Sequence, residues 1–162
     1  MDRDWRFPQS GHGNDWARGY LYAIENAMTD PIFRYSFTIP ENVIDENGHV
    51  NNVAYVQWMQ DVAIRHGREG VGYNPPENTT WVAREHRIEY LLPAFLGEEI
   101  EVRTWVSDIR RVRSRRKYEF IRKSDRKVIV KGETDWVYVD IRTGRPIAIP
   151  AGFDQFFPVL PD

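Results

Sequence analysis

The chain has 162 residues, 41% of them hydrophobic, which is enough for one domain to bury its own core without disulfides or a metal. Its 22 Lys and Arg residues nearly balance its 24 Asp and Glu residues, and the net charge of -2 argues against nucleic acid as a partner. The absence of cysteine excludes a thiol nucleophile, a cysteine metal site and any disulfide.

Residues 1–31 are expected to form an N-terminal extension with a short helix. The N-terminus is charged, no signal-like apolar segment follows, and no apolar run could span a membrane, so we expect a cytoplasmic protein without a membrane span. Helical spacing before Pro31 places four apolar residues on one face: Trp16, Tyr20, Ile24 and Ala27. That face either packs on the main domain or serves as a lid or a dimer contact.

The main domain is expected over residues 32–150, beginning with a strand over residues 33–39 that Pro40 ends. A loop follows in which Asp45, Asn47 and His49 alternate around a turn-forming Asn-Gly pair, and such a turn can aim all three side chains inward. Asn51 or Asn52 then offers a side-chain oxygen to cap a helix. The first N–H groups of that helix would point back at the loop.

The helix is predicted from about residue 52 to residue 68. Its apolar residues spread around most of its circumference, which is typical of a buried helix wrapped by a sheet: Val53, Ala54, Tyr55, Val56, Trp58, Met59, Val62, Ala63 and Ile64.

Four further strands are predicted after a loop rich in Gly and Pro, over residues 81–92, 99–108, 112–123 and 127–140. Their short connections favour antiparallel pairing. The expected fold is therefore α+β, an antiparallel sheet of about five strands around one long central helix. Residues 151–162 are expected to form a C-terminal tail that packs as a short helix or an irregular wrap.

The loop can be interpreted in two ways. A carboxylate, an amide and an imidazole beside a helix N-terminus could hydrolyse or rearrange a carbonyl compound, because the N–H groups stabilise a developing oxyanion. Alternatively, the Asn and Asp side chains only satisfy the turn and cap the helix, and His49 is structural.

The pattern Asp-x-Asn-x-His-Val-Asn-Asn at residues 45–52, followed by a helix with aromatic residues, resembles the hotdog-fold thioesterases. These include the bacterial 4-hydroxybenzoyl-CoA thioesterase-like group and the plant acyl-ACP thioesterases. A weaker second stretch at residues 87–94 accompanies it, with Gly97 and Glu98 following. The resemblance implies a hotdog fold, a homodimer or dimer of dimers, and a site at the subunit junction.

The resemblance also implies roles for four residues. Asp45 would act as general base or nucleophile, while Asn47 and His49 would orient water and the carbonyl group. The backbone N–H of Asn52 would donate to the thioester oxygen. The Glu-Cys pair of the plant enzymes is replaced here by Pro93-Ala94, which favours acyl-CoA over acyl carrier protein as the carrier.

Six basic residues lie within residues 110–117. They can bind the phosphates of coenzyme A or an acidic carrier protein, with Arg113 and Arg115 as the first candidates. Equally, they can be the charges that protect an exposed edge strand. The histidines lack companions at metal-ligand spacing, so no metal site is predicted.

We therefore expect a thioesterase that hydrolyses an acyl-CoA or acyl-ACP thioester, with no cofactor beyond the coenzyme A or carrier protein in the substrate. One alternative is a hotdog hydratase or dehydratase, whose motif has a proline and one extra residue that this loop lacks. Another is a module that binds acyl thioesters without turnover.

Overall fold

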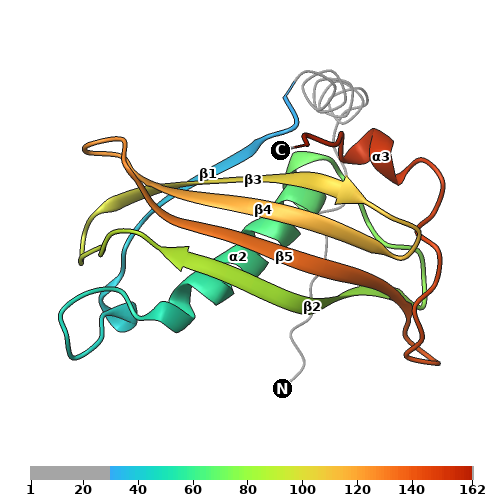
Figure 1. Cartoon of the computed structure of the whole chain (residues 1–162), viewed down its shortest axis with the longest axis horizontal. Coiled ribbons are helices and arrows are strands. Elements are labelled where there is room, and N and C mark those ends of the chain that lie inside the picture. The colour runs from blue at the N-terminus through green and yellow to red at the C-terminus, as the bar shows by residue number, and fades with distance from the viewer. Residues whose placement is uncertain (1–29, 162) are drawn as a thin grey trace, which may run out of the picture.

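A computed structural model describes residues 30–161 of the chain. The predicted N-terminal helix therefore lies outside the described residues. Within them, five strands form one antiparallel sheet, and one long helix crosses a single face of it (Figure 1). No helix in the described chain is long and apolar enough to cross a membrane.

The strands lie close to the predicted ranges, and the predicted five-stranded antiparallel sheet with one long helix is confirmed. Their bounds are β1 Phe33–Thr38, β2 Thr79–Tyr90, β3 Glu99–Ile109, β4 Arg113–Arg122 and β5 Val128–Asp140. Their order across the sheet is β1-β3-β4-β5-β2. Consecutive strands β2 and β3 are therefore not neighbours, and β2 forms one edge of the sheet.

The long helix α2 spans Asn52–Arg65 and continues as a π-helical turn over His66–Gly70. Tyr55, Met59 and Val62 are its buried residues. Met59 packs over Gly132 of β5, where an added Cβ would lie 2.7 Å from the Met59 sulfur. The glycine therefore allows the helix to approach the sheet closely.

The expectation that α2 is buried on most of its circumference is wrong for the single chain. Val53 is 72% exposed and Ile64 is 43% exposed, and both lie on a helical stripe with the exposed Gln57 and Gln60. The reason is that one sheet covers only one side of a helix. Part of the apolar surface of α2 is left to water in the isolated chain.

The C-terminal segment closes the far end of the helix–sheet layer. A short helix α3, Phe153–Phe156, begins it, and the aromatic rings of Phe153 and Phe157 pack with Val106 in a second core cluster. The N–H of Leu160 donates to the carbonyl of Val106 at 2.9 Å. This segment lies beside the C-terminal half of α2, whereas the loop before α2 lies at the opposite end of the sheet (Figure 1).

Candidate active site

The loop before α2 is closed by backbone hydrogen bonds. The N–H of Asp45 donates to the carbonyl of His49 at 3.0 Å, and the N–H of Gly48 donates to the carbonyl of Asp45 at 3.0 Å. Gly48 has a φ of 79°, a conformation that glycine adopts without strain. The predicted turn therefore forms and holds the loop side chains in a fixed order.

The carboxylate of Asp45 is the group around which the loop is arranged. Its Oδ1 accepts the N–H of Asn47 at 2.9 Å, and its Oδ2 lies 3.5 Å from the Asn47 amide nitrogen. The Nδ1 atom of His49 is 3.8 Å from Oδ1, beyond hydrogen-bond distance. The structure thus brings the three predicted loop residues together.

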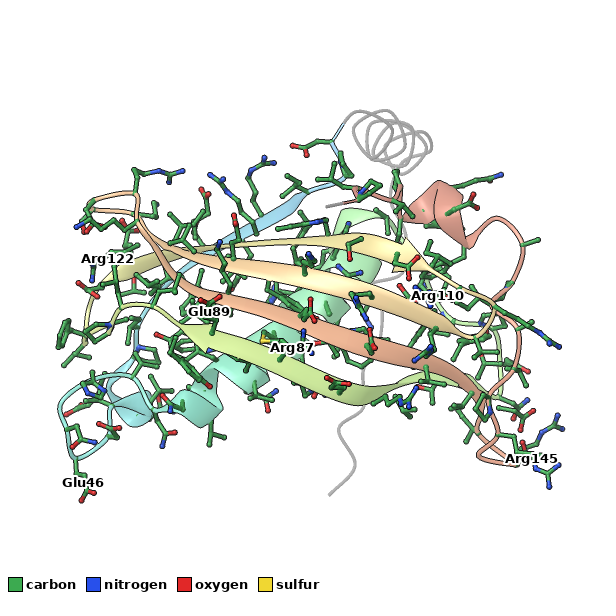
Figure 2. The ribbon with its side chains drawn as sticks, viewed as in Figure 1. Glu46, Arg87, Glu89, Arg110, Arg122 and Arg145 are labelled. Atoms are coloured by element: carbon green, nitrogen blue, oxygen red, sulfur yellow. The ribbon has the colours of Figure 1, made fainter. Side chains whose placement is uncertain are left out.

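The expected inward aim of all three side chains is only partly observed. Asp45 is the least accessible, with 24% of its side chain exposed. The side chain of His49 is 41% exposed, and Asn47 is also exposed. Glu46 points away from the body of the protein at the tip of the loop (Figure 2). The loop projects beyond the sheet, so nothing within the described chain covers its outer side, and water reaches the carboxylate.

The start of α2 leaves one backbone donor open. Asn51 is the N-cap, and its side-chain oxygen accepts the N–H of Val53 at 2.9 Å. The N–H of Ala54 donates to the carbonyl of Asn51 at 3.0 Å. Asn52 is the first helical residue, and its N–H has no acceptor among the described residues. The helix dipole adds positive partial charge at this point, which favours a negatively charged oxygen.

Tyr90, at the end of β2, fixes the same helix start. Its hydroxyl donates to the carbonyl of Asn52 at 3.1 Å. The sequence gives no sign of this contact, because the two residues are distant in the chain. It places the start of α2 beside the end of the edge strand β2.

The second stretch of the sequence resemblance also meets the loop. The N–H of Val50 donates to the carbonyl of Ala94 at 2.9 Å, and Ala94 is 1% exposed. Arg122 donates from Nη1 to the carbonyl of Pro93 at 3.2 Å. The Pro93-Ala94 pair therefore acts as a backbone support beneath the loop.

Arg113 and Arg115 lie on the outer face of the sheet. Strand β4 alternates, with Ser114, Arg116 and Tyr118 buried toward the helix side and the odd-numbered residues partly exposed. Arg115 also donates from Nε to Asp135 at 2.9 Å. The substrate-binding role of Arg113 and Arg115 stays a prediction, and it requires a ligand on the face opposite α2.

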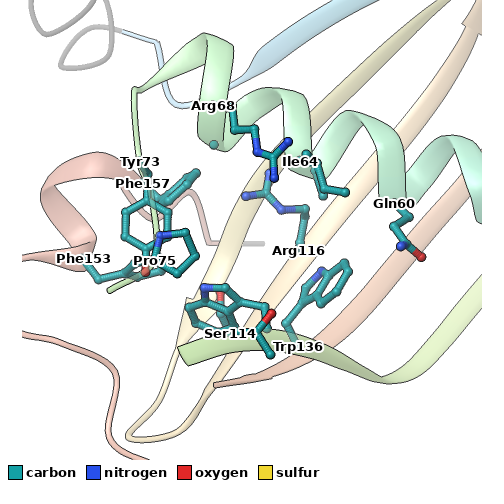
Figure 3. A pocket seen from close by; sticks show the side chains of 14 residues that line it. Gln60, Ile64, Arg68, Tyr73, Pro75, Ser114, Arg116, Trp136, Phe153 and Phe157 are labelled. Atoms are coloured by element: carbon teal, nitrogen blue, oxygen red, sulfur yellow. The ribbon is translucent and has the colours of Figure 1, made fainter. Parts of the chain in front are cut away.

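A cavity of about 340 Å³ lies between the C-terminal half of α2 and the sheet (Figure 3). Two arginines, Arg68 and Arg116, line it, and no Asp or Glu does. Its other lining residues are mostly aromatic, small or aliphatic: Gln60, Ala63, Ile64, Gly67, Tyr73, Pro75, Thr80, Trp81, Ser114, Trp136, Phe153 and Phe157.

Arg116 is the residue of the basic cluster that points inward. Arg113 and Arg115, the first candidates for substrate binding from the sequence, point to the outer face instead. Arg116 is 6% exposed. Its Nη1 donates to His66 Nδ1 at 2.8 Å and to Thr104 Oγ1 at 3.2 Å. The sequence does contain a sign of this inward orientation. Side chains alternate along a strand, so Arg116 lies on the same face as the large apolar residues at 118 and 120.

His66 must be neutral for this contact to form. A guanidinium can only donate, so Nδ1 of His66 accepts and its other ring nitrogen carries the proton. Burial and the neighbouring Arg116 charge lower the pKa of His66 from 6.5 to about 2. The unfolded chain therefore binds a proton between those pH values that the folded chain does not, and stability is lost as the pH falls below 6.5.

We expect the free energy of unfolding to fall by roughly 2 kcal/mol between pH 7 and pH 5 because of His66. Urea denaturation at the two pH values measures the difference. In the variant His66→Gln, which has no titrating ring, most of the difference should disappear. A pH dependence that persists unchanged in His66→Gln would mean that other groups carry it.

Comparison with known proteins adds a family match. The model of the thioesterase-like superfamily matches residues 40–157. No curated protein sequence is similar enough to count as a match.

Solved structures with the same fold include the PA5185 protein from Pseudomonas aeruginosa, with a TM-score of 0.72 and 20% identity over 80% of this chain and 92% of that one. A DHNA-CoA thioesterase from Staphylococcus aureus has a TM-score of 0.68 and 20% identity over 78% and 84% of the two chains. An acyl-ACP thioesterase from Bacteroides thetaiotaomicron has a TM-score of 0.72 and 24% identity over 86% of this chain and 56% of that one. At these identities, the likeness is one of fold.

Proposed function

The chain belongs to the thioesterase-like superfamily, and we propose that it hydrolyses an acyl-CoA thioester to a free acid and a thiol. In the proposed reaction, the oxygen of water bonds to the thioester carbonyl carbon and the carbon–sulfur bond breaks. The sulfur leaves with a proton as the thiol. The reaction needs no redox cofactor, because coenzyme A is part of the substrate.

The observation that carries the proposal is a carboxylate and an open backbone donor on the same short segment. Asp45 is partly exposed, and the N–H of Asn52 at the start of α2 has no acceptor within the described chain. The carboxylate can take a proton from water or attack the carbonyl carbon itself. The N–H of Asn52, with the helix dipole behind it, can stabilise the oxyanion that forms.

Asn47 and His49 have supporting roles in this proposal. The backbone and side-chain N–H groups of Asn47 restrain the Asp45 carboxylate, and His49 lies close enough to share a water molecule with it. The imidazole could then hold the attacking water or pass a proton to the leaving sulfur.

Thiol release from a panel of acyl-CoAs tests the proposal, with the same acyl groups on acyl carrier protein as a second carrier. The protein itself contains no cysteine, so a thiol reagent detects only product. Release from either carrier supports a thioesterase. A product that keeps its thioester but gains or loses water would instead indicate a hydratase or dehydratase, and binding without any product would indicate a binding module.

We also propose that the protein is a homodimer that pairs through the β2 edge. Strand β2 is an edge strand of 12 residues, and its free side offers unpaired backbone groups to another strand. Val53, 72% exposed, follows Asn52, whose carbonyl bonds to Tyr90 at the end of β2. A second copy along this edge would cover both the strand and the exposed Val53 of α2.

The dimer predicts a mass of twice 19.1 kDa by light scattering. The variant Val53→Asp should shift the mass toward the monomer, because it places a charge in the surface that the second copy covers. The control is Val159→Asp, which changes a 40% exposed valine on the β3 side of the sheet. A wild-type protein that remains a monomer at micromolar concentration would contradict the dimer.

A further inference from the structure

Arg116 is a buried cation without an anionic partner. It is 6% exposed, and its two hydrogen-bond acceptors, His66 and Thr104, are both neutral. No Asp or Glu of residues 30–161 forms an ion pair with it. Burial lowers the pKa of the Arg116 guanidinium, which reflects the cost of holding this charge away from water. Buried charges are normally paired, because an unpaired one costs several kcal/mol.

The surroundings of Arg116 supply further donors but no negative charge. Arg68 also lines the cavity, and no Asp or Glu is among the lining residues. Trp136 and Tyr73 add aromatic surface to the same cavity. A cavity with two guanidinium groups and no carboxylate is suited to an acceptor that carries negative charge.

The guanidinium is also held in place. His66 accepts from its Nη1, and the His66 ring stacks on Phe33 with centroids 5.1 Å apart. The guanidinium carbon lies 5.3 Å from the ring centre of Phe157. Thr104, which is fully buried, accepts a second bond. Such fixed orientation favours recognition of a planar anion, since less side-chain freedom is lost on binding.

We propose that this cavity binds the far end of an acyl group that carries a second carboxylate, which pairs with Arg116. The inference rests on the proposed thioesterase function and narrows its substrates to thioesters of dicarboxylic acids. The apolar and aromatic walls pack against the hydrocarbon part, and the planar guanidinium matches a carboxylate with two parallel hydrogen bonds. Arg68 adds a second positive charge to the same cavity.

The position of the cavity indicates how long the acyl group is. Asn52, at the proposed oxyanion site, and His66, which accepts a hydrogen bond from Arg116, are fourteen positions apart on α2 and the helical turn that continues it. This separation corresponds to about 21 Å along the helix axis. The second carboxylate is therefore expected well away from the thioester carbon, as in dodecanedioyl-CoA rather than succinyl-CoA.

Paired substrates test the inference. Dodecanedioyl-CoA and dodecanoyl-CoA have the same chain length and differ in the terminal carboxylate, so the ratio of their kcat/KM values measures its recognition. We expect wild type to favour dodecanedioyl-CoA by about 10- to 100-fold, and Arg116→Met to lose most of that preference. Arg116→Lys keeps the positive charge but loses the two parallel N–H donors of the guanidinium, so its preference for the carboxylate-ended substrate should lie between those of wild type and Arg116→Met. The control Arg110→Met changes a surface arginine paired with Asp108 (Figure 2) and should keep the preference.

A second measurement does not depend on hydrolysis. Suberate should raise the midpoint of thermal unfolding of wild type and have much less effect on Arg116→Met, with 1,8-octanediol as a comparison compound of the same length that carries no carboxylate. If no thiol is released from any substrate but suberate still binds through Arg116, the thioesterase proposal fails and the anion site stands.

Two results would overturn the anion site itself. The first is a wild type that neither prefers dodecanedioyl-CoA nor binds suberate, which would make Arg116 a purely structural residue. The second is an Arg116→Met variant whose affinity for free coenzyme A falls while its response to suberate does not change. That result would assign the guanidinium to a phosphate of the carrier rather than to the acyl group.

Discussion

Replacing Asp45 by asparagine is expected to lower kcat/KM for thioester hydrolysis by about 100-fold or more. Asparagine has nearly the same shape, and its side-chain oxygen can still accept the N–H of Asn47, which donates to Asp45 at 2.9 Å in the wild type. The variant therefore keeps the turn but loses the group that can accept a proton from water or attack the carbonyl carbon. Thiol release at substrate concentrations below KM measures the effect.

Glu46→Gln is the matched control for Asp45→Asn. It removes a carboxylate from the neighbouring residue of the same loop, and the Glu46 side chain points away from the protein (Figure 2). We expect it to keep activity close to that of wild type. If the two variants lost activity equally, the effect would come from the charge of the loop rather than from Asp45. If Asp45→Asn kept full activity, the proposed mechanism would be wrong.

Replacing Asn52 by proline should lower kcat by about 100- to 1,000-fold, the usual effect of removing one donor from an oxyanion hole. Proline has no backbone N–H, and the first position of a helix is where it is best tolerated. The preceding residue, Asn51, has φ -60° and ψ 135°, an extended conformation that is compatible with a following proline. The substitution thus removes a single donor at a position where the fold accepts the change.

Asn52→Ala separates the backbone from the side chain. Alanine keeps the N–H and should lose far less activity than proline does. Circular dichroism and the urea midpoint of both variants show whether the helix start is intact. A large loss in Asn52→Ala together with a small loss in Asn52→Pro would transfer the role from the backbone N–H to the side-chain amide.

The two ends of α2 have different proposed roles. Its N-terminal end carries the proposed chemistry, with Asp45 in the preceding loop and the open N–H of Asn52. Its C-terminal half borders the cavity that contains Arg116. A variant at one end should therefore change the rate on all substrates, whereas a variant at the other end should change the preference among substrates. Measuring Asp45→Asn and Arg116→Met on the same substrate pair would separate the two effects.

Local periodicity and turn chemistry were enough to predict several elements of the fold. Alternation of large and polar residues predicted strands close to β1, β3 and β5, and the Asn-Gly turn with Gly48 at φ 79° formed where expected. The order Asp45, Asn47, His49 also placed these residues together without any distant contact. Such features follow from the sequence, because they depend on residues that are near one another in the chain.

Features that depend on residues far apart in the chain became visible in the folded structure. It showed that β2 pairs with β5 and forms an edge, that Asn51 rather than Asn52 caps α2, and that Val53 remains exposed. It also showed that Arg116, one of six basic residues in this stretch, is the one that lines the cavity. This depends on the packing of His66 and Phe157 against the inner face of β4. Strand order and burial come from long-range packing, and local sequence patterns do not specify which surfaces meet.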